Sequence, residues 1–412
     1  MTHDVSPAVP SEVAPAAGTG RSHPRTPPAG RLIGLDLARG LAILGMFAAH
    51  VGPEPSVGGP LGWTMELARG RSAALFALLA GFTLVLLTGR PQPRTGRAGS
   101  QAVRRVLIRS AVLIALGYAL TSMDTDVDVI LACYGLVLVL ALPLYRLRAV
   151  TLAVLAASTA LVLPQVLYVL RAAVEGGSWA DVVIARDPLA RISGTDGIVE
   201  LFITGAYPVL TWLPFIIAGM AVAKLDLTRP GVPARMALTG GALAVLGYGG
   251  SWLALHLVAG ARAGVNAATD TGAAASAWWS DAVGEDPAAG IPAWLLVAAP
   301  HSQTTWSILG NTGVAVAVLA ACLVATDRSA RLRWWAAPVI AVGTISLTAY
   351  VGHILALKAP AIDNLSDSAA LPTLLVFAAG AMLLALAWTR VFRRGPLEYM
   401  LHTATNPARL IR

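Results

Sequence analysis

The sequence predicts an all-α, polytopic integral membrane protein with about ten transmembrane helices. Of its 412 residues, 56% are apolar and only 13% are charged, which is about half the charged share of soluble domains. The mean hydropathy is +0.68. The apolar residues gather in runs of about twenty, which is long enough for a helix to cross a hydrocarbon core. A compact soluble enzyme is excluded, because its surface would need far more polar side chains.

Ten segments meet this length requirement. We place the helices near residues 32–51, 68–88, 103–122, 127–145, 149–170, 203–223, 235–257, 304–325, 335–357 and 369–391. The sixth segment contains Pro208 and Pro214, so we expect it to be kinked or partly re-entrant. An even number of spans places both termini on the same side of the membrane.

The basic residues predict which side that is. Arginine clusters recur on alternate segments, whereas the intervening loops hold only Arg171, Arg186, Arg191, Arg262 and Lys358. By the positive-inside rule, both termini are cytoplasmic and the protein spans the cell (inner) membrane several times. Because the net charge of +8 follows this topology, we expect the lipid bilayer and no nucleic acid as a partner.

The chain divides into three predicted regions. Residues 1–30 are rich in Pro, Ala, Ser, Thr and Gly and show no apolar periodicity, which is typical of a disordered tail. Residues 31–395 contain the transmembrane segments. Residues 396–412 form a cytoplasmic C-terminal segment. The sequence is also compatible with a homo-oligomer.

Ionisable side chains within a span are costly, so each is a functional candidate. The first segment carries Asp36, Arg39 and His50. The spacing of Arg39 and His50 corresponds to about three helical turns, so both lie on one face, about 16 Å apart. Asp36 lies one turn before Arg39 and can neutralise it. We take His50 as a catalytic candidate, supported by Asp36 and Arg39. The alternative is that the ion pair only fixes helix packing and His50 lies at the membrane interface.

Other polar side chains reach the same outer level of the membrane. His301 opens the eighth segment and is the second catalytic candidate, while His256 and His353 end the seventh and ninth segments. Polar residues at helical spacing add candidates for substrate binding: Arg71, Tyr207, Asn311, Tyr350 and His353. Each of them taken alone is equally typical of an interfacial residue. We expect no metal, because no His-x-x-x-His pair or nearby cysteine accompanies the histidines.

Arginines near the inner end of the third segment are candidates for contact with a nucleotide-like cofactor. Arg104, Arg105 and Arg109 can each donate hydrogen bonds to phosphate oxygens. Membrane topology alone also explains them. The sequence contains no P-loop, Rossmann glycine fingerprint or Gly-x-Ser-x-Gly nucleophile motif.

The segment from Arg31 to His50 resembles the first helix of the transmembrane acyltransferase superfamily. Its Arg-x(10)-His spacing, from Arg39 to His50, is similar to the signature of acyltransferase family 3. The rest resembles bacterial relatives of heparan-alpha-glucosaminide N-acetyltransferase, including the YeiB-like proteins. The stretches that carry this resemblance are Gly70–Gly81, Gly205–Pro214, Pro300–Ser302, Ile345–His353 and Gly395–Tyr399.

The resemblance implies that an acyl group, usually acetyl, moves from cytoplasmic acyl-CoA to an acceptor at the outer face. Acetyl-CoA is then the expected donor, and a glycan or another small envelope molecule is the expected acceptor. The resemblance implies a catalytic histidine near the outer end of the early helices, and His50 matches the histidine of the Arg-x(10)-His signature. Two alternatives remain: a transporter or flippase, whose sites also combine polar stripes with broken helices, and a non-enzymatic membrane scaffold.

Overall fold

The computed structural model describes residues 32–90, 92–123, 127–269, 271–284, 291–358 and 367–409. Within these ranges the chain consists of helices and connecting turns, with no β-strand, so the predicted all-α class is confirmed. The tail predicted for residues 1–30 lies outside the described residues, as do residues 410–412 of the predicted C-terminal segment. The chain divides into two units, residues 1–32 and residues 33–412. All the described helices belong to the second unit.

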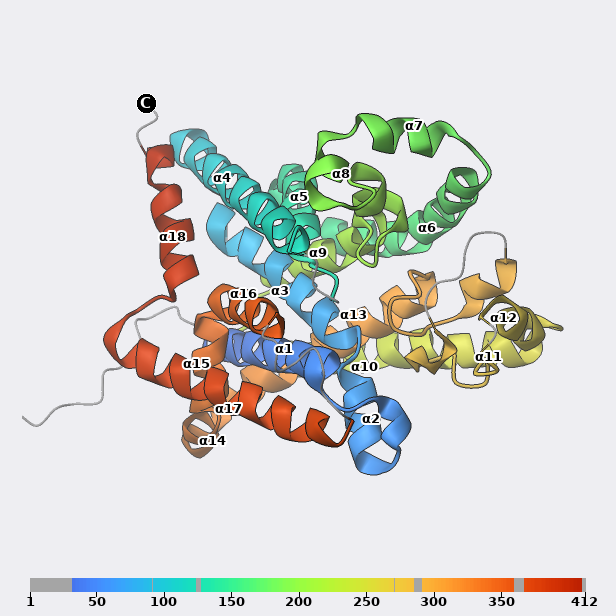
Figure 1. Cartoon of the computed structure of the whole chain (residues 1–412). Helices are drawn as coiled ribbons and strands as arrows, with labels where there is room; N and C mark the ends of the chain where they lie inside the picture. Colours follow the sequence, from blue (N-terminus) through green and yellow to red (C-terminus); the bar gives the residue numbers. More distant parts are fainter. Residues whose placement is uncertain are drawn as a thin grey trace, which may run out of the picture. The chain divides into compact units, whose positions relative to one another are not determined.

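The described residues contain eighteen α-helices, which Figure 1 shows in chain order. The first half contains α1 (Ile33–Val51), α2 (Gly59–Ala68), α3 (Arg71–Thr88), α4 (Gly96–Thr121), α5 (Leu131–Ala141), α6 (Ala149–Glu175), α7 (Trp179–Arg186), α8 (Pro188–Ser193) and α9 (Val209–Ala223). The second half contains α10 (Val232–Ala244), α11 (Gly250–Leu257), α12 (Ala261–Thr269), α13 (Thr305–Arg328), α14 (Ala330–Trp335), α15 (Ala337–Thr344), α16 (Ser346–Leu357), α17 (Asp367–Val391) and α18 (Pro396–Ala404).

Each of the ten predicted segments contains a helix, but fewer than ten helices are both long and apolar enough to span a membrane. Six described helices qualify, or seven if the bent pair α15–α16 counts as one span. The stretches Leu131–Arg146 and Val209–Ala223 are apolar but shorter. Helix α4 has the length but carries four arginines. The predicted count of about ten spans is therefore not confirmed.

The predicted ninth span, residues 335–357, is not one continuous helix. It consists of α15 and α16, which meet at an angle of 87°. Ile345 at the break has φ −118° and ψ 34°, outside the helical region. The carboxylate of Glu398 accepts hydrogen bonds from the backbone N–H groups of Leu347 and Thr348, which are free at the start of a new helix. A capped helix start replaces the expected straight span.

The interruption expected from the prolines of the sixth segment is present. A π-helical turn, Glu200–Thr204, ends before Gly205, and α9 begins only after Pro208. The backbone between them is not helical. This irregular stretch brings Tyr207 next to the side chain of Trp212.

The long apolar helices differ in how much of their length is buried. The buried share of the apolar window is 56% in α1 and in α13, against 22% in α6 and 11% in α17. Where α3 packs on α9, a Cβ atom at Gly81 or Gly219 would collide with a carbonyl of the facing helix. Small residues allow such close approach between membrane helices.

The two ends of the helices differ in chemistry. At the arginine end, Arg90 donates to the carbonyl of Leu225 at 2.8 Å and Lys224 donates to the carbonyl of Tyr145 at 2.7 Å. These bonds join the chain segments after α3, after α9 and before α6. At the opposite, histidine end lie the last turns of α1 and α16 and the turn at residues 300–303. There the segment 255–299 builds a small apolar core of its own from Leu255, Ala261, Val265, Ala274, Ala277, Val283, Trp294, Val297 and Ala299.

Candidate active site

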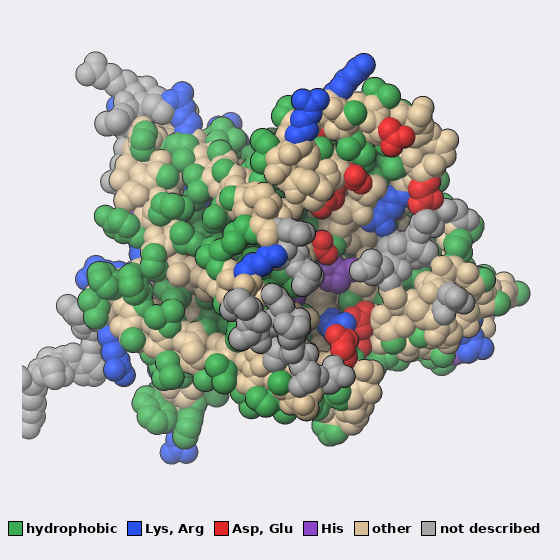
Figure 2. Space-filling model, viewed as in Figure 1, with side chains coloured by type: hydrophobic (Ala, Val, Ile, Leu, Met, Phe, Trp, Pro, Cys, Tyr) green, Lys and Arg blue, Asp and Glu red, His purple; other side chains and the backbone are tan. Residues whose placement is uncertain are grey.

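A cavity of about 900 Å³ opens at the histidine end. Its walls come from the end of α1, the turn between α2 and α3, residues 127–128, Arg171 of α6, residues 195–207, residues 281–284 and the turn at residues 300–303. Figure 2 shows histidine surface in a hollow with acidic and basic side chains beside it. The polar residues of this histidine-end cavity are His50, Arg69, Asp128, Arg171, Thr195, Asp196, Glu200, Thr204, Tyr207, Asp281, His301 and Gln303.

Two of the predicted site residues, His50 and His353, are hydrogen-bonded to each other. Nδ1 of His50 lies 2.9 Å from Nε2 of His353, and the two rings stack at 20° with centroids 5.2 Å apart. The residues are 303 positions apart in the chain. His50 lines the histidine-end cavity, whereas His353 is 3% exposed behind it. Since Nδ1 of His50 is engaged, Nε2 is its nitrogen available to a bound molecule.

Aromatic side chains hold His353 in place. Phe47 lies one turn before His50 on α1, and its ring centroid is 4.7 Å from that of His353. Tyr350 meets the His353 ring edge-on at 5.2 Å, and its hydroxyl accepts a hydrogen bond from the backbone N–H of Ile130. Tyr350, predicted to bind substrate, is therefore buried and packs against the histidine pair.

His301 lies on the wall of the same cavity, in a strained turn. Both His301 and Gln303 have positive φ values, 59° and 58°, a region that costs a non-glycine residue of order 1–3 kcal/mol. The Gln303 side chain secures the turn, because it accepts from the Thr211 hydroxyl at 2.6 Å and donates to the carbonyl of Ala206 at 2.8 Å. The ring of Tyr207 lies 5.4 Å from that of His301. Strain of this kind is typical of functional sites.

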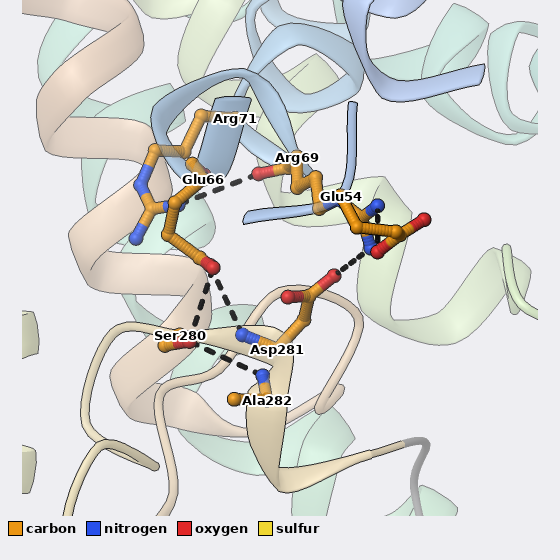
Figure 3. Close-up of polar contacts among 7 residues, drawn as sticks. All are labelled: Glu54, Glu66, Arg69, Arg71, Ser280, Asp281 and Ala282. Carbon is orange, nitrogen blue, oxygen red and sulfur yellow. Dashed lines mark hydrogen bonds and ion pairs between the residues drawn. The ribbon is translucent and has the colours of Figure 1, made fainter. Parts of the chain in front are cut away.

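An ion-pair network anchors the floor of the cavity (Figure 3). Arg69 contacts Asp281 at 2.6 Å and Glu54 at 2.7 Å. The Glu66 carboxylate accepts from the Ser280 hydroxyl and from the backbone N–H of Asp281, both at 3.0 Å. These contacts tie the α2–α3 turn to residues 280–281. Arg69 thus presents a neutralised, partly exposed guanidinium to the cavity.

Arg71 and Asn311, predicted to bind substrate, do not line this cavity. Arg71 is 5% exposed and donates to the carbonyls of Glu66 and Trp279, while its guanidinium lies 5.0 Å from the ring centroid of Tyr248. The Tyr248 hydroxyl donates to Asn311. The two residues thus share a buried polar layer that supports the cavity from behind.

The acidic wall of the cavity includes Glu200 at the start of the π-helical turn. Burial raises the pKa of this carboxyl above its ordinary value, the Thr195 hydrogen bond opposes that shift, and the nearby Asp128 and Asp196 add to it. A carboxyl in this position binds its proton more tightly than one in water. The cavity therefore holds a carboxyl group whose surroundings favour its protonated form.

A second, smaller cavity of about 200 Å³ lies toward the arginine end. Arg39, Arg109 and Glu398 line it together with Leu79, Leu84, Leu113 and Leu138. The Arg39 guanidinium pairs with Asp36 at 3.2 Å, as predicted from their spacing, and also donates to the Thr83 hydroxyl at 2.6 Å. Of the three arginines predicted to contact a cofactor, Arg109 lines this arginine-end cavity, and Arg104 and Arg105 do not.

A series of aromatic rings separates the two cavities. Phe76 and Tyr134 line the arginine-end cavity and stack with centroids 5.4 Å apart. Phe76 also stacks on Tyr350 at 6.4 Å, and Tyr350 touches His353. Ring contacts therefore run from the wall of one cavity to the histidine pair at the other.

Sequence reasoning missed several residues of the two cavities, notably Arg69, Glu200 and Glu398. Gly70 alone separates Arg69 from Arg71 in the sequence, and the turn at Gly70 decides which of them lines the cavity. Glu398 belongs to the Gly395–Tyr399 stretch, whose likeness to known proteins was the available signal. Among the described residues, no group of three or more His, Cys, Asp or Glu side chains is placed to hold a metal ion.

Two family models match the chain. Residues 287–408 match a family described as a protein of unknown function, DUF418. Residues 31–251, which include α1 with His50, match the model described as heparan-alpha-glucosaminide N-acetyltransferase, catalytic. No curated protein matches the chain. Because the second model covers more than half of the 412 residues, the chain belongs to the family of the heparan-alpha-glucosaminide N-acetyltransferase catalytic domain.

Proposed function

We propose that this protein is a membrane acetyltransferase, with acetyl-CoA entering from the arginine end and the acceptor binding in the histidine-end cavity. Family membership supports acetyl transfer in general terms. The observation that carries the proposal is the setting of His50. Its ring lines a cavity of about 900 Å³ while His353 engages Nδ1, so that Nε2 is left to meet an acceptor.

The arginine-end cavity suits part of the donor. Its volume of about 200 Å³ is below that of a typical cofactor pocket, so it fits a thioester arm rather than a whole nucleotide. Its leucine walls suit an apolar chain, and Arg109 lies close enough to Arg394 for the two charges to interact. Arg394, which is exposed and does not line the cavity, would meet the phosphates outside it, and Arg109 on the cavity wall would attract them from within. Acyl-CoA supplies an activated acyl carbon with a thiolate as leaving group.

His50 acts as the general base in this proposal. Nε2 takes the proton from a hydroxyl or amine of the acceptor while that oxygen or nitrogen bonds to the acyl carbon. The bond from carbon to sulfur breaks, and the departing thiolate receives the proton that His50 holds. His301, on the same cavity wall, is placed to hydrogen-bond the acceptor or the acyl oxygen.

The walls of the histidine-end cavity favour a polar acceptor. Four carboxylates line it, from Asp128, Asp196, Glu200 and Asp281, and carboxylates accept hydrogen bonds from hydroxyl and amine groups. The Tyr207 ring offers a flat apolar surface beside them. A small molecule or glycan that carries hydroxyl or amine groups fits this combination.

The direction of transfer follows from the distribution of charge. We place the arginine end and both termini in the cytoplasm, and the histidine end outside the cell membrane, on the positive-inside rule. Donor and acceptor would then approach from opposite sides of the aromatic series Phe76, Tyr134 and Tyr350, and the acyl end of the donor would have to pass these rings to reach the acceptor beside His50.

The test is transfer by the purified protein in lipid nanodiscs, with labelled acetyl-CoA and a panel of hydroxyl- and amine-bearing acceptors. His50→Ala and His50→Gln should both lower turnover by about a hundredfold to ten-thousandfold, the range for a lost general base. His256→Ala is the matched control, because His256 is exposed and bonds to the Trp252 carbonyl outside the cavity. Normal turnover in both His50 variants with loss in His301→Ala would move the role to His301.

The break between α15 and α16 favours a transporter as the second candidate, since transporter sites are commonly built at broken helices. Such a protein would carry the acceptor-like molecule across the membrane and leave acetyl-CoA unchanged. Proteoliposomes that take up a cavity ligand without acyl transfer, equally in wild type and His50→Gln, would establish this alternative.

A further inference from the structure

We infer that His353 is a positioning residue that fixes His50 in the Nδ1–H tautomer and thereby leaves a lone pair on Nε2, facing the cavity. The tautomer follows from the geometry alone. Only its consequence for the rate rests on the proposed acetyl transfer.

The contact between the two rings requires one donor and one acceptor. Nδ1 of His50 and Nε2 of His353 are 2.9 Å apart, the length of a normal hydrogen bond. A neutral imidazole carries hydrogen on one nitrogen and a lone pair on the other. The choice of donor therefore decides the tautomer of both rings.

The surroundings of the other His353 nitrogen make that choice. Nδ1 of His353 is buried without a well-formed hydrogen bond, and the backbone groups that interact with this ring are those of Ala349 and Tyr350 in the preceding turn of α16, whose exposed atoms toward a side chain are carbonyl oxygens. A carbonyl oxygen can only accept. A hydrogen on Nδ1 is attracted to these oxygens, whereas a lone pair there would be buried against other lone pairs.

The tautomer of His50 follows. With its hydrogen on Nδ1, His353 has a lone pair on Nε2 and must accept. His50 then donates through Nδ1–H, and its Nε2 carries the lone pair that a general base needs. His353 does for His50 what a carboxylate does in the serine protease triad, which orients the imidazole and selects its tautomer, but it does so as a neutral ring.

His353 is held rigidly enough for this task. It is 3% exposed between the rings of Phe47 and Tyr350, and Tyr350 itself is 1% exposed. Besides His353, the groups of other elements that interact electrostatically with His50 are His301 and Arg69, and both line the cavity. The acceptor for Nδ1 of His50 is therefore a residue behind the cavity, His353, whereas His301 and Arg69 lie on the cavity wall itself.

The experiment compares His353→Leu with His353→Gln. Leucine removes the acceptor, whereas the glutamine amide oxygen can reach the place of Nε2 and accept from His50. We expect kcat to fall about 10- to 100-fold in His353→Leu, by analogy with lost hydrogen-bond partners of metal-ligating histidines, with an unchanged KM for acetyl-CoA. His353→Gln should recover most of the activity. His256→Leu is the control for loss of a histidine elsewhere.

Nitrogen NMR of ¹⁵N-histidine protein in nanodiscs reads the tautomer without any activity. The His50 signals are assigned by their loss in His50→Gln. In the wild type, Nδ1 should have the shift of a protonated nitrogen and Nε2 that of an unprotonated one, and His353→Leu should change this pattern. A protonated Nε2 in the neutral wild-type ring, or an unchanged pattern in the leucine variant, overturns the inference.

The two readouts separate the inference from the proposed function. If the spectra show the Nδ1–H tautomer but no variant or wild-type preparation transfers acetyl, the positioning role stands and the acetyltransferase proposal fails. If the wild type transfers acetyl and His353→Leu folds with normal kcat, the proposed function stands and the positioning role fails.

Discussion

The carboxylate of Glu398 on α18 accepts a hydrogen bond from the Thr348 hydroxyl on α16 at 2.6 Å. The same carboxylate receives the backbone N–H groups of Leu347 and Thr348. A residue near the C-terminus therefore caps the first turn of the helix whose other end holds His353. The C-terminal segment is thereby linked to the histidine pair through a single helix.

Loss of this cap should weaken the fold and the site together. We expect Glu398→Ala to lower the free energy of unfolding by about 1–2 kcal/mol, the usual cost of a lost N-terminal cap, and to reduce turnover because α16 frays. Thermal unfolding and turnover in nanodiscs measure both effects. Met400→Ala changes an exposed side chain on the same helix and should be neutral. A Glu398→Ala variant as stable as the wild type would show that α16 does not need the cap.

Gly70 should be irreplaceable, because two independent features exclude a side chain there. Its φ is +63°, and a Cβ atom would lie 2.9 Å from Cβ of Pro300 and 3.7 Å from the His301 ring. A left-handed conformation costs an L-residue about 1–2 kcal/mol. Gly70→Ala should therefore lower thermal stability and, through displacement of the 300–303 turn, turnover.

Gly352→Ala is the matched control for this substitution. A Cβ atom at Gly352 meets nothing within 4 Å, and the residue lies within α16 next to His353, where alanine is favoured over glycine. We expect the Gly352→Ala variant to be at least as stable as the wild type. Equal losses in both variants would mean that backbone strain at Gly70 plays no special part.

How much of this site was predictable varies from residue to residue. The all-helical class and the common face of Asp36 and Arg39 were predictable because residues three or four apart on one helix remain neighbours in the folded protein. The pairing of His50 with His353 joins residues 303 positions apart, so no local pattern contains it. The break at Ile345 was missed because residues 335–357 read as one apolar run. The carboxylate that caps α16 after the break belongs to Glu398, which lies 51 positions after Leu347.

Glu200 should make stability depend on pH. Burial raises the pKa of its carboxyl, so the folded state holds the proton more tightly than the unfolded state. The contribution of Glu200 to the free energy of unfolding is therefore most favourable at low pH. It is lost as the pH rises through the raised pKa of the folded state. Glu200→Gln carries no charge at any pH, so the variant should gain thermal stability over the wild type at about pH 8 and little at about pH 4.5.

The control for this pH series is Glu175→Gln, which removes an exposed carboxylate at the end of α6. Unfolding temperatures of the three proteins, measured in the same nanodiscs at both pH values, give the comparison. A stability difference between the Glu200→Gln variant and the wild type that shrinks as the pH rises would contradict the burial argument.

The pair of Asp36 and Arg39 should act as a unit. Their side chains are 3.2 Å apart in the first half of α1, and an uncompensated charge within a span costs about 3 kcal/mol on insertion scales. Arg39→Ala should lower the yield of folded protein, and adding Asp36→Asn should restore it. Thr83→Val isolates the hydrogen bond from Arg39 to the Thr83 hydroxyl. Equal yields of the single and double variants would show that the two charges do not depend on each other.

The orientation in the membrane is open to a direct chemical test. Ser56, exposed just after α1, belongs to the histidine end, and Ser100, exposed near the start of α4, belongs to the arginine end. Both native cysteines, Cys133 and Cys322, are buried, so alanine replacement of both gives a silent background. Ser56→Cys should react with a membrane-impermeant maleimide in right-side-out vesicles, and Ser100→Cys only in inverted ones, because arginine-rich loops stay in the cytoplasm.

The opposite pattern would reverse the orientation and place the donor and acceptor cavities on the wrong sides for the proposed transfer. Labelling of both sites from one side would mean that the histidine and arginine ends do not face opposite sides of the membrane.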